Sequence, residues 1–271
     1  MSETELSADT ATADLVLKFL CGPESVEKGG NDVTGVMPDM SYDQAYLAQF
    51  ASKVLQAGAN GPIIGYQASL TSEAAKKLAP PGMPTPYIGT LQLRNWCLPT
   101  AALPISPAYA YVIECETGMR LARALAGPGL TAADARKSVA TVHAALEIVP
   151  IKPGLIGCTG QHMVAIHNFG SNVVFAEHGV PADVDLVNEP VELFFDGEPV
   201  VQAVAGDSWG DPFAVLAEIA NILGRYGRRL EAGMVVMTGS ATAPQRLTDG
   251  ASRIEAQFGR LGSVNISLQR N

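Results

Sequence analysis

The chain has 271 residues, of which 47% are hydrophobic, and its 27 acidic against 18 basic side chains give a net charge of -9. This hydrophobic content suffices for one large core, whereas the scattered basic residues exclude the cationic surface that binding to a nucleic-acid backbone requires. No run approaches the roughly 20 apolar residues of a membrane helix, and the N-terminus is acidic where a secretory signal would be basic, so we expect a cytoplasmic protein with no nucleic-acid or membrane partner.

The N-terminal part of the chain is expected to be helical. A short first helix precedes a Gly- and Pro-rich connector over 22–40, and Ser41 begins a capping box that opens a second helix. The next pattern, over 62–69, indicates a strand. This change predicts two parts, a helical segment over 1–60 and a β-rich domain over 61–271 that carries the site.

The remaining elements are predicted from caps and periodicity. Thr71 or Ser72 caps a short helix, residues 108–117 form a strand, and Thr131 opens the clearest helix, expected to run to about Leu146. Asp211-Pro212 opens a further helix. Four more strands are expected over 190–195, 199–204, 252–258 and 262–268, with a short apolar run over 233–239. The turn Asp196-Gly197 is predicted to join the first two of these strands as a hairpin. Helices would dominate before residue 150 and strands after it, which indicates a mixed α/β (α+β) protein and not a doubly wound sheet.

Two glutamates in the predicted strand over 108–117 are candidate metal ligands. Glu114 and Glu116 are two residues apart, so their side chains project from the same face of the strand. Buried together, the two carboxylates would repel each other and lose hydration, and a hard divalent cation would remove both penalties. The alternative is that the pair lies at the exposed end of the strand and is solvated.

Glu147 is a third candidate. The predicted helix that begins at Thr131 would end at this residue, where the helix dipole disfavours a carboxylate. A metal ion would explain the residue, and so would an ion pair with the nearby Lys152.

The order of several segments resembles a known family. In chain order these are 65–72 (GYQASLTS), 113–116 (IECE), 127–134 (GPGLTAAD) and 145–149 (ALEIV), then Asn168, 206–212, 239–243 (GSATA) and 258–264 (FGRLGSV). The ordered set covers about residues 41–268. It is similar to the 2-keto-4-pentenoate hydratase branch of the fumarylacetoacetate hydrolase superfamily, which also includes 4-oxalocrotonate decarboxylase.

This resemblance implies a fold, a cofactor and a ligand. The fold is a mixed β-sandwich roll with flanking helices, usually assembled as a homo-oligomer. Glu114, Glu116 and Glu147 would hold Mg²⁺ or Mn²⁺, and a small 2-oxo acid would chelate the ion, which acts as a Lewis acid. The substrate-binding positions that the resemblance implies are Leu70, Thr71, Ser72, Asn168, Ser240 and Thr242. Thr71 and Ser72 suit a helix cap equally well.

The sequence departs from the family pattern at three places. Gln67 stands where the family usually has an active-site lysine, and an amide cannot replace an ammonium as a proton donor. Residues 150–152 are Pro-Ile-Lys where the family usually has Asp-Ser-Arg. His167 stands where the family has an aspartate. We expect Gln67 and His167 to line the pocket as catalytic residues, with His167 as general acid or base; the alternative is a hydrogen-bonded structural histidine.

The function expected from the resemblance is that of a metal-dependent lyase. A hydratase would act on a small 2-hydroxydienoate or its 2-oxo tautomer, compounds that arise in aromatic ring degradation. A decarboxylase on the same scaffold is one alternative. A carbon–carbon hydrolase is another, although no His-Glu pair that would activate water is recognisable. The absence of the lysine favours a third, an accessory homologue associated with a pathway partner enzyme.

Overall fold

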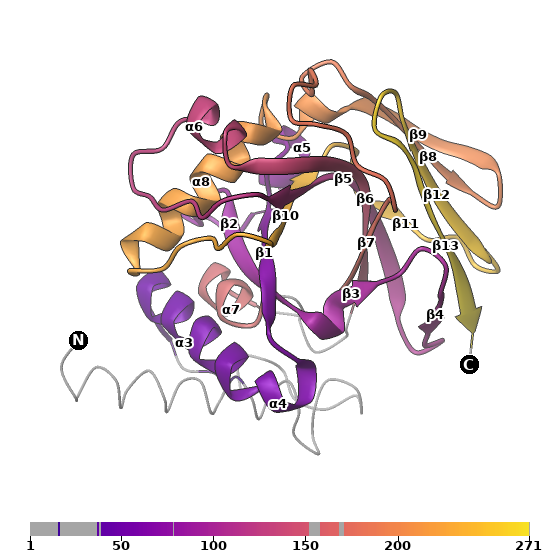
Figure 1. The fold of residues 1–271 in the computed structure, drawn as a ribbon. Coiled ribbons are helices and arrows are strands. Elements are labelled where there is room, and N and C mark those ends of the chain that lie inside the picture. The colour runs from indigo at the N-terminus through magenta and orange to yellow at the C-terminus, as the bar shows by residue number, and fades with distance from the viewer. Residues whose placement is uncertain are drawn as a thin grey trace.

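The computed structural model describes residues 16, 37, 39–77, 79–151, 158–167 and 171–270. Two β-sheets form most of this part of the chain, and Figure 1 shows the smaller sheet on one side and the longer helices on the other. The expected first helix and most of the connector over 22–40 lie outside the described residues, and so do Leu78, Lys152 and Asn168.

Sheet A, the larger sheet, has the strand order β2-β1-β10-β5-β6-β7-β3, and β11 also pairs with β5. Its strands are β1 (Ile63–Ser69), β2 (Tyr87–Gln92), β3 (Trp96–Cys97), β5 (Ala110–Leu121), β6 (Val139–Ile151), β7 (Asn172–Phe175), β10 (Val235–Ser240) and β11 (Gln245–Arg246). The antiparallel pair β5–β6 has neighbours on both sides. The backbone positions of these two strands are therefore fixed by pairing along most of their length.

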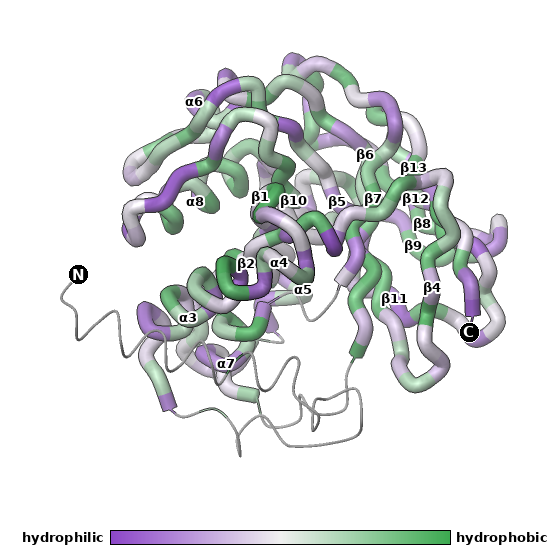
Figure 2. The backbone as a smooth tube through the Cα atoms, turned by 60° about the horizontal axis from the view of Figure 1, so that its bottom comes forward, coloured by the Kyte–Doolittle hydropathy of each residue, from purple (hydrophilic) through white to green (hydrophobic). Residues whose placement is uncertain are grey.

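Sheet B has the order β4-β13-β12-β8-β9. Its strands are β4 (Ala102–Ile105), β8 (Pro190–Phe195), β9 (Glu198–Val204), β12 (Arg253–Phe258) and β13 (Gly262–Arg270). The predicted hairpin turn is confirmed, since Asp196 and Gly197 have φ of 52° and 88°, as a two-residue turn of this kind requires. Both views place β12 and β13 beside β6 (Figures 1 and 2), and the main hydrophobic core lies between the sheets.

The helices are α3 (Tyr42–Leu55), α4 (Ala57–Asn60), α5 (Glu73–Lys76), α6 (Ala132–Arg136), α7 (Gly160–Ala165) and α8 (Pro212–Arg225), with 3₁₀ turns η2 (Leu93–Asn95) and η4 (Ala205–Asp207). The predicted starts at Ser41 and Asp211 are confirmed, because both side chains accept a backbone N–H of the first turn. Buried residues of α3, such as Phe50, belong to the main core. The division of the chain at residue 60 stays a prediction.

The predicted helix from Thr131 to Leu146 is wrong in length. Helix α6 ends at Arg136, and Val139–Ile151 is strand β6, paired with β5 from end to end. Nearly all of β6 is buried on both faces, and a central strand buried in this way shows no alternation in the sequence. Tertiary pairing has overridden the helix propensity of its alanines.

The prediction that helices dominate before residue 150 is wrong as well, since strands β1 to β6 all lie between Ile63 and Ile151. The mixed class is confirmed. Among the described residues, no helix has both the length and the apolar composition that crossing a membrane requires.

Candidate metal and substrate site

Three glutamates meet on one face of the β5–β6 pair. Glu114 lies directly opposite Glu147, and Glu116 follows two residues along β5, opposite Ala145. Directly opposed side chains in an antiparallel pair project from the same face. One oxygen of each of the three carboxylates lies within 4.8 Å of one oxygen of each other carboxylate. Glu116 is 0% and Glu147 4% exposed, and Glu114 is partly exposed, so the pair Glu114 and Glu116 does not lie at an exposed end of the strand.

Glu147 belongs to a different secondary-structure element from the one that the sequence predicted. It lies in the middle of strand β6 and not at a helix end, so the dipole argument for it was wrong. Its position follows from the register of β5 and β6, which places it across from Glu114.

Strand β10 holds Glu116 from the neighbouring side. The β5–β10 register shifts between Met237 and Ser240, and at this irregularity the Gly239 backbone N–H donates to Glu116 Oε2 at 2.8 Å. Gly239 has φ of 83°, and a Cβ there would overlap the side chain of Thr71. Only glycine fits both conditions, so this residue is needed for the N–H to face the carboxylate.

Strand β1 contributes the group that orients Glu147. The Gln67 amide nitrogen donates to Glu147 Oε1 at 2.7 Å. The Gln67 amide oxygen is buried and meets no hydrogen-bond donor among the described residues. One end of this side chain therefore fixes a carboxylate, while the other end is free to accept a hydrogen bond from a ligand.

Burial raises the pKa of all three carboxyl groups. Desolvation, followed by repulsion from Glu147, raises the pKa of Glu114 to about 8. Desolvation also raises the pKa of Glu116 well above its ordinary value, with repulsion from both neighbours adding to it. The pKa of Glu147 is raised by desolvation, against hydrogen bonds from Gln67 and Ser171. Three ionised carboxylates are thus unfavourable here unless a cation joins them.

The cluster fits a divalent metal ion. Glu116 Oε1 is buried and has no hydrogen-bond donor among the described residues, and an orphaned oxygen of this kind needs a partner. Carboxylate oxygens converging from three side chains are the ligands that Mg²⁺, Mn²⁺ and Ca²⁺ prefer. Among the described residues this is the one group of three or more such side chains close enough to share an ion.

A cavity of about 350 Å³ opens onto the carboxylates. Glu114 and Glu147 form part of its wall, and Gln67 and His167 line it as well. Gln67 and His167 were expected from the sequence to line the pocket with the carboxylates, and in the structure both line this cavity.

A hydroxyl–imidazole pair lines another part of the cavity. Ser69 Oγ lies 2.9 Å from His167 Nε2, and the rings of Tyr87 and His167 pack in a T-shaped arrangement with centroids 5.0 Å apart. His167 Nδ1 has no hydrogen-bond partner among the described residues. Burial lowers the pKa of His167 to about 3, with a further lowering by Lys53, so the ring is neutral at neutral pH.

The predicted substrate-binding residues divide into three groups. Leu70, Thr71 and Ser240 line the cavity, and Leu70 has φ of 59°, which is uncommon for a leucine. Ser72 caps helix α5 by accepting the Ala75 N–H, which is the alternative role given for it above. Thr242 is fully buried beside Ser240 and does not line the cavity. Asn168 lies outside the described residues.

Sequence reasoning missed several residues of the site. Ser69 was seen only as part of a strand, and its partner His167 is 98 positions away. Gly89 on β2 has no signal of its own, yet a Cβ there would overlap the His167 ring. The glycine at position 239 was noted only as part of a motif. Each of these roles depends on contacts between distant strands.

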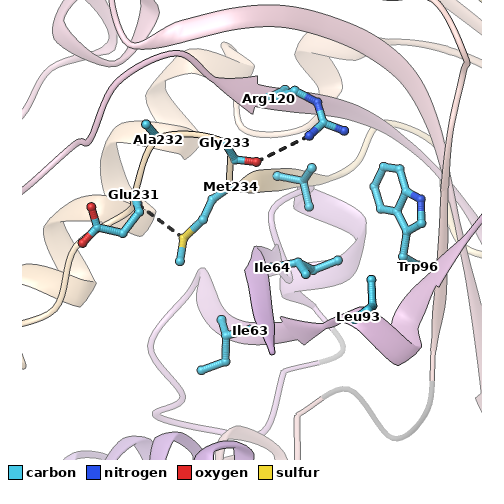
Figure 3. Close-up of a pocket in the computed structure, with 10 residues that line it drawn as sticks. Ile63, Ile64, Leu93, Trp96, Arg120, Glu231, Ala232, Gly233 and Met234 are labelled. Atoms are coloured by element: carbon cyan, nitrogen blue, oxygen red, sulfur yellow. Dashed lines mark hydrogen bonds between the residues drawn. The ribbon is translucent and has the colours of Figure 1, made fainter. Parts of the chain in front are cut away.

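A second hollow, of about 500 Å³, lies on another part of sheet A (Figure 3). Ile64, Trp96 and Met234 give it an apolar lining, and Arg120 donates to the carbonyl oxygen of Gly233 on its wall. Its charged side chains are Arg120 and Glu231. It therefore lacks the convergent titratable groups of the carboxylate cavity.

No family model matches the chain. It is 27% identical over 265 residues to the 4-oxalocrotonate decarboxylase of Pseudomonas putida, covering 94% of this chain and 97% of that protein. It is 25% identical over 234 residues to the 2-hydroxyhexa-2,4-dienoate hydratase of Comamonas testosteroni, covering 85% and 88%. The structure of 4-oxalocrotonate decarboxylase from Pseudomonas putida G7 covers 97% of this chain and 98% of its own, with a TM-score of 0.82 and 22% identity. These similarities confirm the resemblance and the expected roll fold.

Proposed function

We propose that this chain, a relative of those decarboxylases and hydratases, is a divalent-metal-dependent lyase of the hydratase type. Its substrate would be a small 2-hydroxydienoate or the 2-oxo tautomer, as in aromatic meta-cleavage catabolism. The observation that carries the proposal is the buried cluster of Glu114, Glu116 and Glu147, which opens onto a cavity of about 350 Å³.

The three glutamates would hold Mg²⁺ or Mn²⁺. A structure of the decarboxylase from Pseudomonas putida G7 is a complex with magnesium and adipate, and another is a complex with calcium and acetate. When bound, such an ion supplies Lewis-acid polarisation of a chelating 2-oxo acid. The chain's own part is to keep the three carboxylates converged, which the register of β5 and β6 and the Gly239 N–H support.

The residues around the carboxylates would orient the substrate. Gln67 holds Glu147 by its amide nitrogen, and its unpartnered amide oxygen can accept a substrate or water hydroxyl. Thr71 and Ser240 add hydroxyl groups to the cavity wall. Because an amide does not titrate, we assign Gln67 a positioning role and no proton transfer.

Ser69 and His167 would handle the proton. The Ser69 hydroxyl lines the cavity, with His167 Nε2 at 2.9 Å. A neutral imidazole can accept the hydroxyl proton at one nitrogen or donate from it, according to its tautomer. With Nε2 as the acceptor, the pair can take a proton from the substrate through the hydroxyl, which leaves a transient imidazolium, and the imidazolium can return that proton to a substrate carbon. The pair would replace the lysine that the family pattern has at position 67.

A decarboxylase is the second candidate, because a 4-oxalocrotonate decarboxylase is among the most similar relatives. Purified protein assayed with 2-hydroxypenta-2,4-dienoate and with 2-oxohex-3-enedioate, each with Mg²⁺, with Mn²⁺ and with a chelator, separates the two. We expect metal-dependent turnover of the first compound and its loss in Glu114→Ala, but not in Glu192→Ala on sheet B. Turnover of the second compound alone would establish the decarboxylase, and turnover of neither would favour the accessory homologue.

We also propose that the protein forms a homo-oligomer that associates with a pathway partner enzyme. The support is the resemblance alone. Light scattering of the purified chain gives the mass of the assembly, and a monomer at assay concentration would contradict the proposal.

A further inference from the structure

The cavity face of the β5–β6 pair changes chemistry from one register position to the next. Glu114 faces Glu147, the next pair on the same face is Val112 opposite Val149, and Ala110 opposite Ile151 follows. Two residues along a strand span about 7 Å. The wall therefore changes from carboxylate to hydrocarbon within the length of one small substrate.

Other nonpolar side chains of the described lining extend this hydrocarbon surface. Leu70, Met163 and Pro244 line the cavity, and so do Val112, Val149 and Ile151. Among the described lining residues, Glu114 and Glu147 are the charged ones, and none is a lysine or an arginine.

Among the described residues, Lys53 and Arg246 are cations near this lining that do not join it. Lys53 acts on His167 through its charge, and Arg246 is the β11 register partner of Val112. Arg246 is exposed, and neither residue lines the cavity.

The charge balance of the site disfavours a second anionic group. Three glutamates bring three negative charges, a divalent ion would neutralise two, and the carboxylate of a 2-oxo acid would add one more. Beside Val112 and Val149, a further carboxylate would lose part of its hydration and would gain no cationic partner among the described lining residues, and such burial is unfavourable. An alkyl group at the same place would gain free energy from leaving water.

We infer that the site selects 2-oxo acids and 2-hydroxydienoates whose far end is an uncharged alkyl or alkenyl group, and that it rejects dicarboxylates. The head of the substrate lies at Glu114 and Glu147, and the tail extends along Val112 and Val149 towards Ile151. This inference rests on the proposed function, and it assigns the tail pocket to the next two register pairs of β5 and β6.

The test uses unreactive ligands with matched chains. Calorimetry on the Mn²⁺-loaded protein compares pyruvate, which has only the head, with 2-oxohexanoate and 2-oxoadipate, which share a six-carbon chain and differ in a methyl or carboxylate end. We expect pyruvate to bind, and 2-oxohexanoate to bind about tenfold or more tightly than 2-oxoadipate, since a tenfold ratio needs only about 1.4 kcal/mol.

A substitution at the cavity mouth tests the placement of the tail. Ile151 is 46% exposed, so a charged side chain is tolerated there. Ile151→Lys should strengthen 2-oxoadipate binding about tenfold relative to the neutral control Ile151→Gln, because a charge-assisted hydrogen bond becomes available. Equal affinities in the two variants would show that the tail does not reach Ile151, and this would overturn the placement.

The remaining outcomes separate the inference from the proposed function. Equal or tighter binding of 2-oxoadipate by the unaltered protein, with pyruvate bound, overturns the inference alone. The variants Arg246→Ala and Lys53→Met then show which of the two nearby cations is responsible. Failure of pyruvate to bind in the presence of Mn²⁺ overturns the proposed function and the inference together.

Discussion

The two ends of the cavity are built in different ways. The carboxylate end, made of Glu114, Glu116 and Glu147, comes from two long strands at the centre of sheet A. The imidazole end, made of Ser69 and His167, joins the last residue of β1 to a residue that follows α7. A metal site tolerates little displacement of its ligands, and central strands supply that rigidity. Proton transfer needs one mobile hydrogen, and a pair at the ends of elements suffices for it.

The largest effect is expected at the carboxylate end. Glu147→Gln removes a charged ligand and leaves an amide beside Gln67, so we expect kcat/KM for the dienoate to fall about 10³-fold, as when a preorganised electrostatic group is lost. The matched control is Glu192→Gln, the same change within a strand of sheet B, where the carboxylate accepts a hydrogen bond from Gln202. Full activity in Glu147→Gln, or an equal loss in the control, would break the comparison.

At the imidazole end, His167→Asn should lower kcat about 10²-fold, within the range for loss of a general acid or base. The affinity for Mn²⁺ should change by less than about twofold, because the hydrogen bond of His167 joins it to Ser69 and not to a carboxylate. His178→Asn, at an exposed position, is the control. Loss of metal binding in His167→Asn would show that the two ends are one unit.

Gln67 lies on β1, the strand that also carries Ser69, and donates to Glu147 at the carboxylate end, so its removal tests how far the two ends are separate. Gln67→Leu keeps the volume but deletes the hydrogen bond to Glu147, and loss of such an outer contact weakens metal binding about 10–100-fold. Metal titration followed by activity at saturating Mn²⁺ measures both parts. If excess Mn²⁺ restores kcat, Gln67 acts only through Glu147; an unchanged metal affinity would contradict its positioning role.

The smallest effect concerns stability at the irregularity in β10. Gly239→Ala combines a left-handed backbone with overlap on Thr71, whereas Gly250→Ala has nearly the same φ, 89° against 83°, and open space around it. We expect the free energy of unfolding to drop by about 1 kcal/mol at Gly250 and by about 2–4 kcal/mol at Gly239. Denaturant unfolding measures both values. Equal losses would mean that Thr71 moves aside freely.

The sequence allowed the carboxylate end to be predicted further than the imidazole end. The pair Glu114 and Glu116 follows from strand alternation, a local rule, and the hairpin at Asp196-Gly197 follows from turn chemistry. Strand β6 could not be recognised, because burial on both faces removed the alternation from its sequence. Glu147 was found by resemblance, and its stated helical context was wrong. The pairing of Ser69 with His167 depends on packing between distant segments, which no local pattern encodes.

Binding of a divalent ion by the carboxylate end is the central claim, and calorimetric titration tests it most directly. Chelator-treated protein is titrated with Mn²⁺ at pH 7 in two buffers of different ionisation enthalpy. Because the pKa of Glu114 in the metal-free site is raised to about 8, binding should release protons, and affinity should rise between about pH 6 and pH 8. The account predicts one ion per chain, lost in Glu116→Gln and kept in Glu192→Gln. Absence of binding by the unaltered protein, or unchanged binding in Glu116→Gln, would contradict it.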